Sequence, residues 1–294
     1  MFFPGFAVTT VTTSGAVIHT VRGGSGPPLL LLHGHPQTHV MWHKIAGRLA
    51  ERFTVVLTDL RGYGDSSKPP DGERHANYAP RAMALDQIEV MRSFGFERFA
   101  IAGHDRGGRV AHRMALDFPD AVSRLAVLDI APTLTMYDRT DREFATRYVW
   151  WFFQIQPFPI PEHLIGLDPE FYLREHLGRQ SKTPGAVTEA AMAEYLRCYC
   201  NPETIHAACE DYRAAAGIGL ELDAADAAAG RTIAAPLLAL WGAKGVVGDL
   251  YDVTATWRER ANDVTGIALD CGHLLAEEAP EATLEALLTF FSAR

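Results

Sequence analysis

The chain has 294 residues, of which 48% are hydrophobic and 21% are charged. This composition is typical of a globular protein with a large apolar core. Its formal net charge is −9 at pH 7, and no cluster of Lys and Arg offsets that charge, so we expect no nucleic-acid partner. The first residues, MFFPGFAVTT, lack the basic region and the long apolar stretch of a signal peptide. The longest apolar run, Leu29–Leu32 with its neighbours, is too short to cross a bilayer. We therefore expect a cytoplasmic protein without membrane contact.

The chain contains four cysteines, Cys198, Cys200, Cys209 and Cys271. They include no spaced CxxC pair of the kind that holds a structural metal. Three of them lie near one another in the sequence, which is a loose hint of a metal cluster. Incidental thiols of a reduced cytosolic protein explain them better, so we expect no bound metal.

Apolar strands and helical segments alternate along most of the chain. Residues 6–21 alternate in polarity around a Ser14-Gly15 turn, which predicts a β-hairpin. The continuous apolar run 29–32 is typical of a buried strand. Further strands are expected at 53–57, 99–102, 124–128, 236–241 and 266–269, and helices at 42–52, at 80–94, from about 106 and from about 280. This alternation implies right-handed crossovers and a mostly parallel sheet, hence an α/β fold.

The alternation stops in the middle of the chain. Residues 133–222 are rich in aromatic side chains, have a helical pattern and contain no clear strand. We interpret this segment as a helical cap inserted into the sheet domain. The core would then consist of residues 1–132 and 223–294.

Residues 98–115, RFAIAGHDRGGRVAHRMA, form the centre of the functional prediction. A strand, a tight Gly-His-Asp-Arg-Gly turn and a helix give the form of a nucleophile elbow, G-x-Nuc-x-G. The nucleophile position holds Asp105 in place of Ser or Cys. A carboxylate, with a reference pKa of about 3.9, is ionised at neutral pH and can displace a leaving group from saturated carbon, forming an ester. The alternative is that Asp105 only caps the helix N-terminus.

The other motifs favour the elbow over the helix cap. Taken together they resemble the haloacetate (fluoroacetate) dehalogenase family of the α/β-hydrolase fold, over nearly the whole chain. An Asp elbow and the HGxP motif are shared with epoxide hydrolases, whereas the Asp-Arg-x-x-Arg and Glu-Asp-Tyr-Arg segments favour the dehalogenases. The segments that carry the resemblance are HGHPQTHVMWHKIA (33–46), DLRGYGDSSKP (59–69), GHDRGGR (103–109), LDIAPT (128–133), CEDYRAAA (209–216), WGAKGVVG (241–248) and CGHLLAEEAPE (271–281).

This resemblance implies an α/β-hydrolase core with a helical cap, and the hydrolysis of a haloacetate to glycolate and halide through an aspartyl ester. Asp105 is the expected nucleophile, and His273, on a Gly-His loop after the last strand, is the expected base, which fits the chain order of this fold. Asp129 follows the strand 124–128 and is the expected partner of the imidazole. The other usual location, in WGAKGVVG, has no carboxylate before Asp249.

Two arginines follow the nucleophile. Arg109 lies four residues after Asp105 and therefore on the same face of the helix. An ordinary helix ion pair would explain that spacing, and would be worth only tenths of a kcal/mol. The resemblance assigns Arg106 and Arg109 to a clamp for the substrate carboxylate, and their charges would offset the repulsion between two anions.

The resemblance also implies a halide pocket made by a His-Trp pair and a Tyr from the cap. Trp151 and Tyr212 match the Trp and the Tyr, but Trp150 occupies the histidine position. An indole donates one hydrogen bond and carries no charge. His35 replaces the aromatic residue that is usual after His-Gly. A backbone N–H from the His35 region and that of Arg106 are expected to form an oxyanion hole. We expect weak or absent turnover of fluoroacetate and better turnover of chloroacetate or bromoacetate.

Two other interpretations stay open at this stage. An epoxide hydrolase would use the same Asp105, His273 and Asp129, with Tyr212 and Tyr148 as proton donors to the epoxide oxygen. A receptor-like member would bind a small acid without turnover, but the complete Asp/Asp/His set argues against it. Neither the motifs nor the resemblance calls for a metal or an organic cofactor. The resemblance further implies that the protein forms a homodimer. It also implies that the substrate is a small halogenated carboxylic acid.

Overall fold

A mostly parallel sheet of eight strands forms the centre of the protein, described here by a computed structural model of residues 2–293. Its strand order is β1-β2-β4-β3-β5-β6-β7-β8. β2 pairs antiparallel with both β1 and β4, and the remaining pairs are parallel. This confirms the predicted α/β class. The strands are β1 (Ala7–Thr12), β2 (Val17–Gly23), β3 (Pro28–Leu32), β4 (Thr54–Thr58), β5 (Phe99–His104), β6 (Val122–Leu128), β7 (Leu237–Gly242) and β8 (Val264–Leu269).

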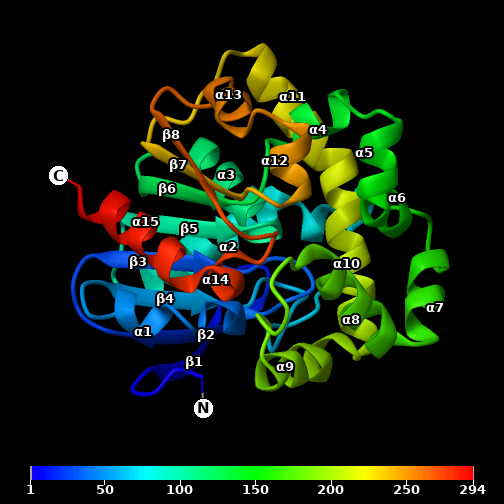
Figure 1. Cartoon of the computed structure of the whole chain (residues 1–294), viewed down its shortest axis with the longest axis horizontal. Helices are drawn as coiled ribbons and strands as arrows, with labels where there is room; N and C mark the ends of the chain where they lie inside the picture. Colours follow the sequence, from blue (N-terminus) through cyan, green and yellow to red (C-terminus); the bar gives the residue numbers. More distant parts are fainter. Residues whose placement is uncertain (1, 294) are drawn as a thin grey trace.

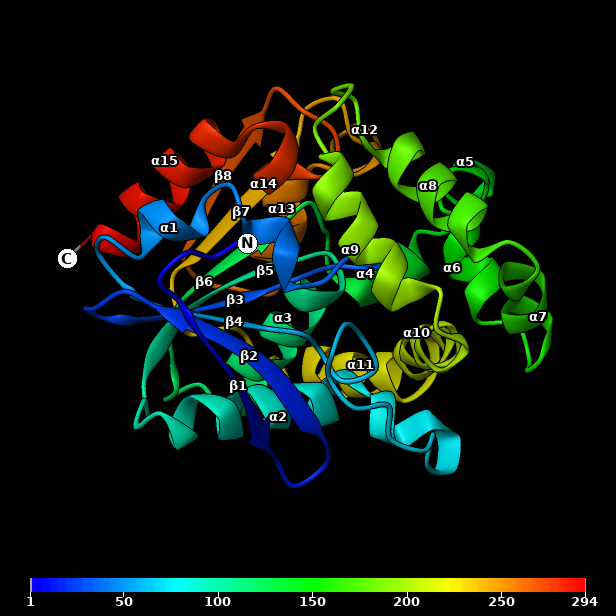
Figure 2. The same ribbon diagram turned by 90° about the horizontal axis from the view of Figure 1, so that it is seen from below.

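Helices cover both faces of the sheet (Figure 2). α1 (Ala46–Leu49) and α15 (Pro280–Ser292) lie on one face, and α2 (Pro80–Ser93) and α3 (Arg106–Asp117) on the other. A strand covered on both faces has no polar side, which is why Leu29–Leu32 form an unbroken apolar run. The smaller core elements are η1 (His39–Trp42), η2 (Glu73–Tyr78), α12 (Val246–Leu250), α13 (Val253–Arg258) and α14 (Leu275–Glu278).

One expected helix is much shorter than the sequence indicated. The segment 42–52 folds as the end of η1, a turn and the four residues of α1. Tertiary hydrogen bonds hold the turn: Lys44 Nζ donates to the carbonyl oxygens of Ala186 and Glu277, both at 2.7 Å. These long-range contacts outweigh the local helical preference.

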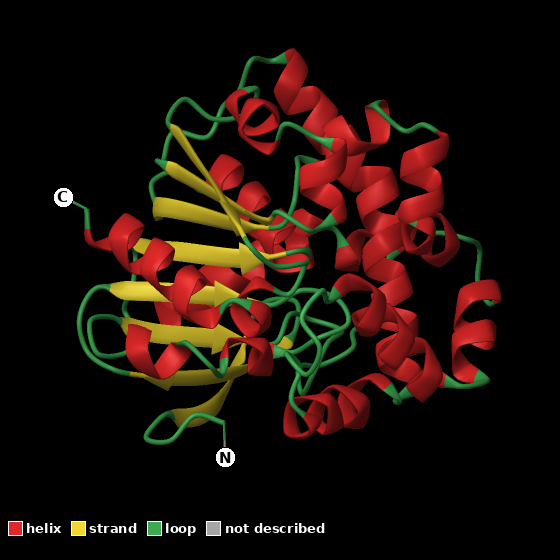
Figure 3. Ribbon diagram, in the orientation of Figure 1, coloured by secondary structure: helices red, strands yellow, loops and turns green. Residues whose placement is uncertain are grey.

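A block of helices lies beyond the carboxyl ends of the parallel strands (Figures 1 and 3). It is inserted between β6 and β7, and its helices run from Thr133 to Ala228, past the predicted end at 222. One π-helical turn, η3, joins α10 to α11. The elements of the insert are α4 (Thr133–Asp138), α5 (Arg142–Arg147), α6 (Val149–Gln154), α7 (Ile160–Gly166), α8 (Pro169–Gln180), α9 (Glu189–Tyr199), α10 (Pro202–Ala214), η3 (Ala215–Gly219) and α11 (Leu220–Ala228).

Within residues 2–293, no helix combines the length and apolar character needed to cross a membrane. The four cysteines are all unpaired, and Cys200 is the exposed one.

Close backbone packing at the elbow requires glycine. A Cβ on Gly103 would lie 2.4 Å from the carbonyl oxygen of Gly107, and one on Gly107 would lie 2.5 Å from that of His33. The end of β5, the start of α3 and the loop after β3 therefore pack backbone against backbone. Loop residues after β3 reach the nucleophile only because these side chains are absent.

We expect Gly103→Ala to lower the free energy of unfolding by about 2 kcal/mol or more, because backbone atoms must move to admit the methyl group. Gly47→Ala is the matched control, since a Cβ on this helical glycine would meet nothing within 4 Å. The control should leave stability unchanged or raise it by up to about 1 kcal/mol. Urea unfolding measures both, and equal stabilities for the two variants would contradict this account of the elbow.

Candidate active site

Asp105 stands at the junction of β5 and α3 with φ 44° and ψ −112°. A positive φ is uncommon for a residue with a side chain, and such strained positions concentrate at functional sites. The carboxylate does not cap α3. Its Oδ1 accepts a hydrogen bond from the backbone N–H of His35, 3.1 Å away. The helix-cap explanation of Asp105 is therefore wrong, and the strained turn presents the carboxylate to other groups.

The Asp105 carboxylate is buried, with 7% of the residue exposed. Burial alone would raise its pKa, but the positive charges of His273 and Arg109, with smaller contributions from His104 and Arg106, hold the pKa well below its ordinary value. Asp105 is thus ionised throughout the neutral range. A buried anion without a proton can act as a nucleophile and needs no base to activate it.

His273 lies beside Asp105 and is held by Asp129. Its Nδ1–H donates to Asp129 Oδ2 at 2.5 Å, while Asp129 Oδ1 accepts from the Gly242 N–H at 2.9 Å. This fixes the tautomer that leaves Nε2 as the lone-pair nitrogen, and Nε2 has no hydrogen-bond partner within residues 2–293. Burial lowers the pKa of His273, but the Asp129 hydrogen bond and charge outweigh that and raise it overall. Asp129 itself has a positive φ of 51° at the end of β6.

The loop that carries His273 is anchored by Glu278, a residue that the sequence patterns did not single out for a role. Its carboxylate accepts from the backbone N–H groups of Gly272, Leu274 and Lys182. The His273 N–H donates to the carbonyl oxygen of Gln180, at 3.1 Å. Lys182 and Gln180 belong to the insert, so Glu278 joins the histidine loop to the cap.

The two arginines differ sharply in their partners. The Arg106 guanidinium donates to the Asp211 carboxylate of α10 through Nε and Nη2, and Tyr63 Oη donates to the same carboxylate at 2.8 Å. Arg109 has no carboxylate partner among residues 2–293. Its Nη1 donates to Thr133 Oγ1 at 2.8 Å and to the Ala131 carbonyl oxygen at 3.2 Å, and its Nε has no partner there.

Burial lowers the pKa of Arg109, and the negative charge of Asp105 opposes this. Because guanidinium stays protonated in proteins, Arg109 is a buried cation with unused donors. An isolated buried charge is costly. A site that keeps one is suited to receive an anion.

A cavity of about 470 Å³ lies between the core and the insert. Asp105, Asp129 and His273 line it from the core, and Trp150, Trp151 and Tyr212 line it from the insert. The other three candidates pack behind this lining. The Arg109 guanidinium lies 4.6 Å from the ring centre of Trp151, the Arg106 guanidinium lies 4.6 Å from that of Tyr212, and the His35 ring centre lies 5.3 Å from that of Tyr212. The structure thus gathers all nine predicted residues in one place, with three of them in the second layer.

His176 of α8 also lines the cavity, and the sequence analysis missed it. It lies in no motif, and a single histidine in a polar helix carries no signal of its position. Its ring centre lies 4.8 Å from that of Trp150 and 5.1 Å from that of His35.

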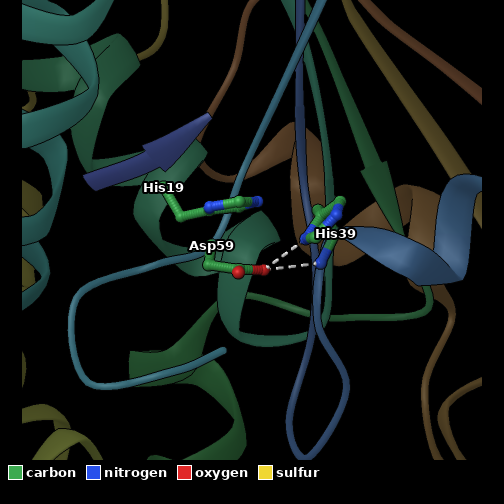
Figure 4. A group of neighbouring side chains, drawn as sticks. All are labelled: His19, His39 and Asp59. Atoms are coloured by element: carbon green, nitrogen blue, oxygen red, sulfur yellow. Dashed lines mark hydrogen bonds and ion pairs between the residues drawn. The ribbon is translucent and has the colours of Figure 1, made fainter. Parts of the chain in front are cut away.

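A second cluster, outside this cavity, has the residue types of a metal site. Side-chain ligand atoms of His19, His39 and Asp59 lie within 4.8 Å of one another (Figure 4). However, Asp59 Oδ1 already accepts from both the Nδ1–H and the backbone N–H of His39, each at 2.8 Å, and Oδ2 accepts from the Asp65 N–H at 2.9 Å. Burial opposes protonation of His39, but Asp59 raises its pKa overall. We interpret the cluster as a buried ion pair that fastens η1 to the loop after β4.

Comparison with known proteins agrees with this architecture. The family described as alpha/beta hydrolase fold matches residues 27–280. The chain belongs to the α/β-hydrolase family. It is 45% identical to a fluoroacetate dehalogenase from Burkholderia sp over 291 residues, covering 99% of this chain and 95% of the relative. This confirms the resemblance proposed from the motifs.

The chain is also similar to an epoxide hydrolase and to a solved α/β-hydrolase structure. The chain is 36% identical to a soluble epoxide hydrolase from Corynebacterium sp. (strain C12), with 95% of each chain covered. It also superposes on the crystal structure of an alpha/beta hydrolase from Nostoc sp PCC 7120 with a TM-score of 0.98, 57% identity and 100% coverage of both chains. This α/β-hydrolase therefore has relatives among both dehalogenases and epoxide hydrolases.

We expect Asp129→Asn to destabilise this α/β-hydrolase more at pH 5.5 than at pH 9. The folded-state pKa of His273 is raised, so its proton stabilises the native state below the unfolded pKa of about 6.5, and this stabilisation is lost as pH rises through the folded pKa. Asparagine keeps the hydrogen bond but removes the charge. The loss should therefore stay below the roughly 3–5 kcal/mol typical of a broken buried ion pair.

Urea unfolding at the two pH values measures this difference. Asp270→Asn is the control, because the Asp270 side chain is 86% exposed beside Lys244, and it should change stability little at either pH. If Asp129→Asn destabilised the protein equally at both pH values, the contact with Asp129 would not be what raises the pKa of His273.

Proposed function

We propose that this α/β-hydrolase is a hydrolytic dehalogenase that converts a haloacetate and water into glycolate and halide. In the first step a carboxylate oxygen of Asp105 attacks the halogen-bearing carbon, and the carbon–halogen bond breaks with its electron pair leaving on the halide. The product is an ester between Asp105 and glycolate. The observation that carries the proposal is an ionised carboxylate at the elbow, next to a buried arginine without a carboxylate partner.

The second step needs a base. In the neutral imidazole of His273, the Nδ1–H bond to Asp129 leaves the lone pair on Nε2, which has no hydrogen-bond partner within residues 2–293. Nε2 takes a proton from water, and the hydroxide oxygen attacks the ester carbonyl carbon of Asp105; the bond from that carbon to the glycolate oxygen then breaks, and this oxygen takes the proton from the imidazolium. The His35 N–H, 3.1 Å from Asp105 Oδ1, supplies one donor to the oxyanion, and the Arg106 N–H at the start of α3 is our candidate for the second. Asp129 stabilises the imidazolium while it exists.

Recognition of the substrate acid is the proposed role of the arginines. Arg109 offers unused donors and a charge without a carboxylate partner. Arg106 is held in place by Asp211, which leaves its Nη1 to reach the substrate. Because both lie behind Trp151 and Tyr212, we expect these rings to shift or the acid to pass between them. The 45% identity with a fluoroacetate dehalogenase supports a small halogenated acid as the substrate class.

For the leaving halide, the proposed donors are Trp150, Trp151 and Tyr212, which line the cavity from the insert. Neutral donors suit chloride and bromide better than fluoride, which is a poorer leaving group and more strongly hydrated. We therefore propose chloroacetate and bromoacetate as the better substrates, with weak or absent release of fluoride.

Epoxide hydrolysis is the second candidate. The same Asp105, His273 and Asp129 would open an epoxide, and the relationship to a soluble epoxide hydrolase favours it. The cavity of about 470 Å³ also has room for a substrate larger than a haloacetate. Tyr148 and Tyr212 line the cavity and would protonate the epoxide oxygen. This reaction leaves Arg109 without a role, which is why we rank it second.

We expect His273→Ala to trap the ester. With chloroacetate, the variant should release about one equivalent of chloride and stop, and mass spectrometry should find a carboxymethyl group on the peptide that contains Asp105. Asp105→Asn is the control for alkylation of Cys200, the exposed cysteine, and should carry no such adduct on this peptide. Diol formation from an aryl epoxide by the wild-type chain, without halide release from any haloacetate, would favour the second candidate.

We expect Arg109→Met to lower kcat/KM for chloroacetate by about 10- to 100-fold, the range for a lost hydrogen-bonded charge pair. Chloroacetamide, which has no charge, should be affected far less, so the variant should lose the preference for the acid. Because the Arg109 charge helps to keep the buried Asp105 carboxylate ionised, its replacement should also lower the free energy of unfolding. Equal losses for the two substrates would contradict the proposed carboxylate contact.

A further inference from the structure

His176 is a buried polar side chain in the cavity without an assigned role. Only 1% of the residue is exposed, and it shares the cavity with Asp105 and His273. Its Nδ1 is buried and has no hydrogen-bond partner within residues 2–293. Leaving such an atom unsatisfied destabilises the folded state. Folding stability alone does not account for a histidine at this position.

Aromatic neighbours hold the ring in one orientation. Trp150 meets it edge-on, with ring centres 4.8 Å apart and planes at 66°, and His35 meets it at 5.1 Å and 88°. Tyr172 stacks against it at 5.9 Å and 26°. None of these contacts uses a ring nitrogen as a hydrogen-bond partner. The ring is therefore positioned by its carbon framework while its polar atoms stay available.

The surroundings also decide its charge. Burial lowers the pKa of His176 to about 3, and the negative charge of Asp105 only partly opposes this. At neutral pH the imidazole is uncharged and carries one N–H and one lone pair. It is a poor source of protons, but it can donate a hydrogen bond to an anion. A neutral donor places no further positive charge beside Arg109 and Arg106.

The first step of the proposed reaction creates an anion on the side of the carbon opposite Asp105, because displacement at saturated carbon is in-line. His176, on α8 of the insert, lines this cavity and packs against Trp150, one of the residues that we expect to receive the halide. We propose that His176 is a specificity-determining donor of this site, whose N–H binds the departing halide beside the Trp150 ring. The inference rests on the proposed dehalogenase function. No proton leaves His176: the carbon–halogen electron pair goes to the halide, which accepts the hydrogen bond.

The test compares leaving groups in His176→Phe, which keeps an aromatic ring and removes both nitrogens. A smaller halide has a higher charge density and depends more on a donor. We expect kcat/KM to fall about tenfold for chloroacetate and about threefold or less for bromoacetate, within the range for one lost hydrogen bond to an ion. Inhibition by added chloride should weaken in the same variant. A purely structural defect would lower kcat/KM equally for both substrates and would leave the inhibition constant of chloride unchanged.

His112→Phe is the matched control. His112 is also a buried histidine with an unpartnered nitrogen, and its ring centre lies 5.2 Å from that of Trp257 at 88°, outside the catalytic cavity. It should leave the ratio of the two substrates unchanged. His176→Gln retains a side-chain N–H donor and should recover most of the chloroacetate activity and of the inhibition by chloride, which keeps the test decisive if His176→Phe fails to fold.

The two hypotheses can fail separately. A wild-type chain that releases no halide from either substrate overturns the proposed function and this inference together. Halide release by the wild type, with unchanged substrate ratio and chloride inhibition in His176→Phe, overturns only the role of His176. An equal fall in His176→Gln and His176→Phe would likewise show that the N–H is not used.

Discussion

The site depends on keeping one carboxylate ionised inside the protein. Asp105 is buried in a strained turn, and burial by itself favours the neutral acid. The positive charges of His273 and Arg109 reverse that preference, and the His35 N–H donates a hydrogen bond to the carboxylate. His35 and His273 reach Asp105 from distant parts of the chain, whereas Arg109 lies one turn along α3. The turn therefore has its chemical character only in the complete fold.

The contacts between the core and the insert also determine the charge of the site and the position of His273. Asp211 of α10 aligns Arg106 and accepts the hydroxyl of Tyr63, so a cap carboxylate neutralises one of the two arginines and leaves the other unpaired. Glu278 and the Gln180 carbonyl oxygen hold the His273 loop against the insert. The cap is thus part of the catalytic frame, because the orientation of the base and the charge of the site both depend on it.

The same nucleophile and base could serve two reactions, haloacetate hydrolysis and epoxide hydrolysis. The groups that would distinguish the two reactions are the other residues of the cavity. Attack by a carboxylate followed by hydrolysis of the ester serves a haloacetate and an epoxide equally well. An anionic substrate needs a fixed cation, and a departing halide needs an N–H donor instead of an acid. In our proposal Arg109, which has no carboxylate partner among residues 2–293, and the neutral His176 would meet these two requirements, whereas an epoxide would depend on the tyrosines. The relationship to both kinds of enzyme follows from this shared chemistry.

The sequence alone determined the α/β class and the inserted helices, because strand runs and helical periodicity are local patterns, and it predicted the nine candidate residues from the elbow turn and the family motifs. It overestimated the helix at 42–52, where long-range bonds from Lys44 prevail, and it placed Arg106 and Arg109 in equivalent roles. Only the tertiary structure decided that Asp211 occupies the first and leaves the second without a carboxylate, and that His176 lies in the cavity. Charge pairing and burial depend on which distant segments meet, and no pattern along the chain records that.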